Sequence, residues 1–156
     1  MTIQLEKEYL VALLGLVVGA GAGLIAAAVY GRATRQGIRP GRWDARVTIP
    51  LLLAAAGAHL VLIPVVESRR QLLFGLYFAA LIGTVIFAMV GLSIWRLGAV
   101  LLPVGSVLAY FYFAFQVHQA DYVGLAVKMV EVAAIAAALV PITRRGRDHV
   151  KQPVVE

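Results

Sequence analysis

Residues 121–142, DYVGLAVKMVEVAAIAAALVPI, decide the fold class. A helix of this length covers about 30 Å of hydrocarbon, because each residue advances a helix by about 1.5 Å. The stretch nevertheless carries Lys128 about 10 Å and Glu131 about 15 Å from its first residue. An unpaired charge near the middle of a bilayer costs at least about 2.5–3.5 kcal/mol. We therefore expect a transmembrane helix whose two charged side chains face other helices and not lipid.

The composition indicates the same class for the rest of the chain. Apolar residues make up 62% of the 156 residues and charged residues only 14%, whereas soluble domains are about 45–50% apolar. The absence of cysteine excludes disulfides, thiolate metal sites and cysteine nucleophiles. The first apolar run has an acidic flank and is too long for a signal-peptide core, so we expect it to be retained. The chain is predicted to be an all-α, polytopic membrane helical bundle forming a single domain.

Five hydrophobic stretches are predicted to be transmembrane helices, because backbone groups in hydrocarbon must be hydrogen-bonded within the helix. The third and fourth are separated only by Trp95 and Arg96, which predicts a tight helical hairpin. We expect spans two to five to form a four-helix core, to which the glycine-rich first span is added. The predicted spans are 9–30, 47–66, 71–94, 97–117 and 121–142, followed by a tail at 143–156.

The distribution of basic residues predicts the orientation. Loops on one side hold ten lysines and arginines, and the opposite side holds Lys7, Arg69 and Arg70. The positive-inside rule then puts the N-terminus outside and the tail in the cytoplasm. The ten residues are Arg32, Arg35, Arg39, Arg42, Arg46, Arg96, Arg144, Arg145, Arg147 and Lys151. We expect them to attract anionic lipid headgroups, and we expect no nucleic-acid binding because the chain has no folded basic domain.

Small residues recur at every fourth position of the first span. Such a face lets another helix backbone approach closely, which is how helices associate in lipid. The pattern leaves the partner open: it is either another helix of the same chain, or a second copy or a foreign subunit. The residues of this stripe are Gly15, Gly19, Gly23, Ala27 and Gly31.

A third polar residue, His59, lies at a matching depth in the second span. Counted from the outer end near Val66, His59 is about 10 Å deep, as is Lys128, and Glu131 lies one turn deeper on the same helix face. We predict that His59, Lys128 and Glu131 form one buried polar cluster in the outer half of the bundle. Either the charged pair neutralises itself and the histidine bonds a carbonyl, or the cluster handles protons or a ligand. No metal site is expected, since the ligands are too few and the ammonium would repel a cation.

Other polar and aromatic side chains carry no motif. We expect Thr84, Ser93 and Ser106 to bond their own helix or a neighbouring one. Tyr110 and Tyr112 are expected near the outer headgroups. The phenylalanines around them form either a lipid-facing belt or a pocket for a hydrophobic ligand such as a quinone.

Three features carry a loose resemblance to other proteins: AAAGAHLVLIPVVE at 54–67, the hairpin around Trp95, and GLAVKMVEVAAIAAALV at 124–140. In these features spans two to five resemble small, uncharacterised bacterial integral membrane proteins. The resemblance covers about two thirds of the chain and implies a four-helix core with an added N-terminal helix. The class has no activity to transfer. The Ala-, Val-, Gly- and Arg-rich composition is what a GC-rich bacterial genome would encode, and we expect the chain to lie in a bacterial inner membrane.

We find no phosphate-binding loop, dinucleotide fingerprint, HExxH or GxSxG motif, so neither an enzyme nor a cofactor is expected. The leading expectation is a non-catalytic membrane module that acts through helix packing. It would be an accessory or assembly subunit of a larger membrane complex, or a homo-oligomer. The alternative is a small transporter or a proton or ion pathway that uses the cluster of His59, Lys128 and Glu131.

Overall fold

The computed structural model describes residues 2–35, 45–66, 68–117 and 122–140. Within these ranges the chain forms five helices and no strand. Four helices are long and apolar enough to cross a membrane, whereas α2 has only 15 residues. The prediction of an all-helical chain is confirmed. The prediction that the apolar stretches form helices long enough to cross a membrane is confirmed for those four. The helices are α1 (Thr2–Arg35), α2 (Thr48–Leu62), α3 (Ser68–Met89), α4 (Trp95–Val117) and α5 (Tyr122–Leu139).

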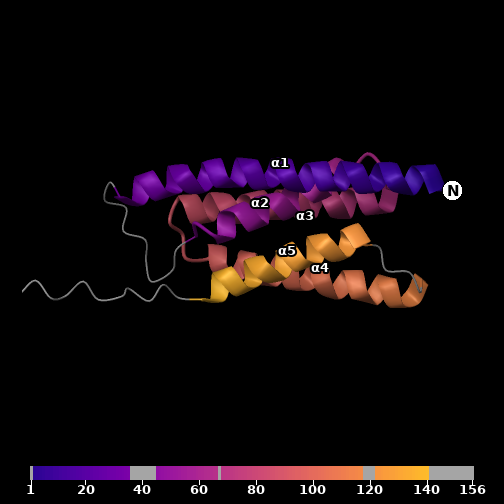
Figure 1. Cartoon of the computed structure of the whole chain (residues 1–156). Coiled ribbons are helices and arrows are strands. Elements are labelled where there is room, and N and C mark those ends of the chain that lie inside the picture. Colours follow the sequence, from indigo (N-terminus) through magenta and orange to yellow (C-terminus); the bar gives the residue numbers. More distant parts are fainter. Residues whose placement is uncertain (1, 36–44, 67, 118–121, 141–156) are drawn as a thin grey trace, which may run out of the picture.

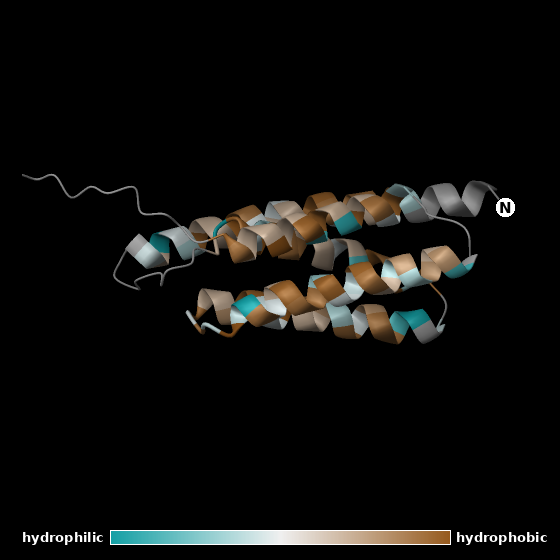
Figure 2. Cartoon of the chain, turned by 90° about the horizontal axis from the view of Figure 1, so that it is seen from below, coloured by the Kyte–Doolittle hydropathy of each residue, from teal (hydrophilic) through white to brown (hydrophobic). Residues whose placement is uncertain are grey.

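The helices run up and down alongside one another (Figure 1). Consecutive helices pack together, and α5 also packs against α2, so that α2, α3, α4 and α5 form a closed ring. The added helix, α1, lies outside this ring and packs mainly on α2. Hydrophobic residues follow all five helices along their length (Figure 2), as expected for a bundle surrounded by lipid.

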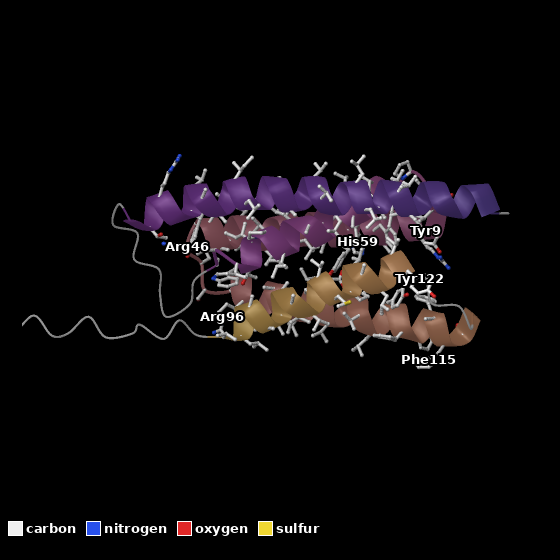
Figure 3. All side chains as sticks on the ribbon, in the orientation of Figure 1. Tyr9, Arg46, His59, Arg96, Phe115 and Tyr122 are labelled. Carbon is white, nitrogen blue, oxygen red and sulfur yellow. The ribbon has the colours of Figure 1, made fainter. Side chains whose placement is uncertain are left out.

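The bundle has two chemically different ends (Figure 3). Arg46 and Arg96 lie at one, which we name the arginine end, and Tyr9 and Tyr122 lie at the other, the tyrosine end. The guanidinium of Arg96 donates from Nε to the carbonyl of Ala138 at 3.2 Å, which satisfies an open carbonyl in the last turn of α5. Arg39, Arg42 and the basic residues of the tail lie outside the described residues, so the orientation in the membrane stays a prediction.

The small residues of α1 face α2. A Cβ atom added to Gly15 would meet the carbonyl oxygen of Gly57, and one added to Gly19 would meet that of Leu53. Gly23 faces the Cα atom of Pro50 in the same way. Partner numbers fall as the α1 numbers rise, so the two helices are antiparallel with their backbones in direct contact.

The other two members of the stripe make looser contacts. A Cβ added to Gly31 would lie 3.3 Å from Nε of Arg46, a flexible side chain. Ala27 is half-buried. Of the two partners left open by the sequence, the stripe therefore packs against a helix of its own chain at Gly15, Gly19 and Gly23.

The second predicted span, 47–66, is too long, because α2 ends at Leu62. Pro64 has no N–H with which to continue a helix. The backbone instead turns over residues 63–66, where the N–H groups of Val65 and Val66 donate to the carbonyl of Leu62 at 3.0 and 3.1 Å. The carbonyl of the last helical residue is thereby hydrogen-bonded although the helix does not continue.

The predicted hairpin turn at Trp95 and Arg96 is also misplaced. Helix α3 ends at Met89, the turn covers residues 90–94, and Trp95 is the buried first residue of α4. Gly91 adopts a φ of +80°, a conformation that side chains disfavour. Because most of this turn is apolar, hydropathy alone continued the third span to residue 94. The first span is longer than predicted, and residues 141–142 of the fifth lie outside the described residues.

Candidate functional site

Glu131 lies at the centre of the four-helix ring, fully buried at 0% exposure. Its Oε2 atom is 2.8 Å from Nζ of Lys128, one turn earlier on α5. Its Oε1 atom is 3.9 Å from Nε2 of His59 on α2. Lys128 and His59 are 7% and 6% exposed. The structure therefore brings together the three side chains that their depths in the sequence had grouped.

Two further side chains complete the group. The hydroxyl of Tyr77 on α3 and that of Ser106 on α4 each donate to Oε1 of Glu131 at 3.0 Å. Lys128 Nζ donates to the oxygen of Ser106 at 2.5 Å. Each helix of the ring thus contributes at least one polar side chain. We name this group the polar centre; it consists of His59, Tyr77, Ser106, Lys128 and Glu131.

Tyr77 was missed by the sequence analysis, and Ser106 was expected only to bond a helix. A depth count could have found both, because Tyr77 lies about 10 Å inward from Arg70 and Ser106 about 16 Å inward from Val117. These depths match those of His59 and Glu131. Depth alone does not reveal which way a side chain points, so the helix rotations had to be known.

His59 has one bonded and one open ring nitrogen. Nδ1 lies 2.8 Å from the carbonyl oxygen of Ala55. Since a carbonyl only accepts, Nδ1 carries the hydrogen, and Nε2 of the neutral ring keeps a bare lone pair. Nε2 has no hydrogen-bond partner among the described residues. The rings of Phe74 and Tyr77 make edge contacts with the imidazole, at centroid distances of 5.2 and 4.6 Å, and fix its orientation.

The Lys128 ammonium is well compensated. Besides the carboxylate and the Ser106 hydroxyl, it lies 5.9 Å from the centroid of the Tyr110 ring, a cation–π contact. Tyr110, expected near the headgroups, therefore also lies against the polar centre. One positive and one negative charge balance here, and a buried pair is tolerated in an apolar bundle only with such additional bonds. Among the described residues, no three His, Asp or Glu side chains gather in a way that could hold a metal ion.

The polar centre lies closer to the tyrosine end than to the arginine end. Helix α2 runs toward the tyrosine end and stops at Leu62, three residues after His59. On the other side, Leu52, Leu81 and Ala134 are buried at 0–1% exposure and continue as the apolar core. The buried apolar cluster therefore lies on the arginine side of the polar centre.

Comparison with known proteins gave no relative: no protein-family model, no curated protein and no solved structure matches this chain. The resemblance carried by residues 54–67 and 124–140 stays a prediction. The function is therefore argued from the geometry of the polar centre.

Proposed function

We propose that the chain is a small transporter, or a proton or ion pathway, whose binding site is the polar centre. The observation that carries this proposal is the open lone pair of His59 Nε2, 3.9 Å from a fully buried carboxylate oxygen. A purely structural ion pair needs Lys128 and neutral donors, which Glu131 already has. It does not need a second acceptor facing the carboxylate, because two facing acceptors repel each other unless a proton or a donor lies between them.

We further propose that α2 crosses the membrane as the fifth span. Its 15 residues cover about 22 Å, less than the hydrocarbon core. Helix α1 ends and α3 begins at opposite ends of the bundle (Figure 1), so the chain between them has to cross it. Helix α2 packs against α1, α3 and α5, which are all longer than it. We place the bundle in a bacterial inner membrane with the N-terminus outside.

The proposal is tested with purified protein in lipid vesicles that contain a pH-sensitive or a sodium-sensitive dye. We expect an imposed gradient to drive flux through the wild-type protein, and we expect the size of this flux to depend on pH. The paired variant Lys128→Met/Glu131→Gln keeps the charge balance and should reduce the flux at least tenfold. Tyr112→Phe alters an exposed tyrosine on α4 and serves as the control with unchanged flux.

Flux no greater than in protein-free vesicles, for protons and for sodium, would reject the proposal. Equal flux through the wild type and the paired variant would reject the polar centre as its route. Circular dichroism and gel filtration of each variant check that the bundle is intact.

A second candidate is the packing module, an accessory or assembly subunit or a homo-oligomer. It is favoured by the outer side of α1, where Leu10, Leu14, Val17 and Ile25 are exposed although the opposite side of that helix packs on α2. Purification in a mild detergent tests it. A stoichiometric second subunit, or a mass that is a multiple of the chain, supports it, and a lone monomer in both detergent and vesicles contradicts it.

A further inference from the structure

We propose that the species bound by the polar centre is the proton, accepted on Nε2 of His59 and held against Oε1 of Glu131. This inference rests on the proposed function and names its ligand. It assigns to His59 the role of proton acceptor and to Glu131 that of the counter-charge.

The bonds already made to Glu131 exclude a larger cation. Oε2 is occupied by Lys128, and Oε1 accepts from both Tyr77 and Ser106. Hard cations such as Mg²⁺ and Ca²⁺ take six or more oxygen ligands, and the described side chains of the centre leave no such set. A proton needs only one lone pair, and His59 Nε2 offers one.

Protonation changes His59 from an acceptor to a donor at Nε2. The imidazolium would donate from Nδ1 to Ala55 and from Nε2 to Oε1 of Glu131, where it would take the place of the Tyr77 or the Ser106 hydroxyl, so both nitrogens would be bonded. A charged N–H···O bond is about 2.7–2.9 Å long, so the present 3.9 Å separation has to shorten by about 1 Å. A hydronium ion from the solvent gives up the proton and leaves as water, and no covalent bond of the protein breaks.

The groups that surround His59 set the balance of charge. Glu131 and Lys128 face it from α5, Tyr77 faces it from α3, and Tyr110 lies beyond Lys128 on α4. Helix α1 has no titratable side chain between Tyr9 and Tyr30. The centre is neutral with His59 neutral, and one bound proton gives it a net charge of +1.

The order of burial indicates the direction of entry. His59 is 6% exposed and Glu131 is 0% exposed, and His59 is nearer the end of α2 that stops short at the tyrosine end. Toward the arginine end the apolar core begins at once. The proton therefore enters from the tyrosine end and meets His59 before Glu131.

The test is a nitrogen NMR titration of the full chain in lipid nanodiscs. Histidine labelled with ¹⁵N is incorporated into a His118→Gln/His149→Gln background, which leaves His59 as the only histidine. At high pH we expect the tautomer with hydrogen on Nδ1, because that nitrogen is held by Ala55. On acidification the imidazolium signal should appear. Adding Lys128→Met/Glu131→Gln should keep the tautomer and remove the imidazolium signal over the same pH range, whereas Tyr112→Phe should change neither.

An Nε2–H tautomer at high pH, or a ring that stays neutral down to the lowest pH at which the bundle stays folded, would overturn the inference. The wild-type titration decides by itself if the paired variant does not fold. Failure of the vesicle experiment is a separate result. Protonation of His59 without flux would reject the transport proposal alone, and sodium flux without protonation would reject this inference alone.

Discussion

At the scale of single residues, the pairing of Lys128 with Glu131 limits what either position tolerates. Both charges are desolvated, so each is stabilised almost entirely by the other and by the hydroxyls around them. The loss of one partner leaves an uncompensated buried charge, which is far more costly than the loss of the whole pair.

We therefore expect Lys128→Met to destabilise the protein by about 3–5 kcal/mol. In Lys128→Met/Glu131→Gln most of that loss should be recovered, because a neutral amide still accepts from Tyr77 and Ser106. Reversible unfolding in mixed detergent micelles, followed by helical circular dichroism, measures both. Arg70→Met, at an exposed position of α3, is the control and should stay within about 0.5 kcal/mol of the wild type. A paired variant as unstable as the single one would contradict this account.

How much of the polar centre the sequence reveals depends on helix geometry. The meeting of Lys128 and Glu131 follows from their spacing of three residues on one helix, and His59 follows from its depth. The place of Tyr77 in the polar centre cannot be predicted in this way, since a tyrosine inside an apolar run is equally suited to lipid, core or headgroups. Its hydroxyl meets Glu131 only because of the rotation of α3 against α5, which no local pattern specifies.

At the scale of helices, the backbones of α1 and α2 come into contact because glycines, which have no side chain, lie between them. In lipid the hydrophobic effect does not drive helices together, so their association depends on close packing. Gly19 lies where an added Cβ would meet the carbonyl of Leu53, while Gly21, two residues later, would meet nothing within 4 Å. The two glycines share a helix and differ only in the face that they occupy.

Gly19→Ala should therefore lower the free energy of unfolding by about 1–3 kcal/mol, as over-packing does. Gly21→Ala should be neutral or raise it by up to about 1 kcal/mol, because alanine is the better helix former. The same micelle unfolding assay compares the two. Equal effects of both substitutions would mean that α1 does not depend on this contact.

The limits of the helices were less predictable than their existence. Hydropathy detects the five apolar stretches, but it is blind to backbone geometry within them. The turn at residues 90–94 is mostly apolar, and its position is set by the positive φ of Gly91. Pro64 by itself does not predict the end of α2, because α4 continues through Pro103 in an equally apolar stretch.

At the scale of the whole molecule, the helices run up and down, so the side of the membrane that one end of the bundle faces fixes the side of every turn. The hairpin turn between α3 and α4 and the start of α3 lie at opposite ends of the bundle. If the arginine end faces the cytoplasm, as the basic residues predict, the proposed proton entry at the tyrosine end is on the outside. The direction of entry and the orientation of the chain can thus be tested together.

Because the chain has no cysteine, single cysteines can report this orientation without background. Ser68, at the start of α3, and Ser93, in the hairpin turn, are both exposed. In intact cells, a membrane-impermeant maleimide should label Ser68→Cys and leave Ser93→Cys unlabelled, and lysis should make the two equally reactive. The reverse pattern would place the arginine end outside, against the bias of the basic residues. The open nitrogen of His59 would then face the cytoplasm, and the bound proton would come from the cell interior.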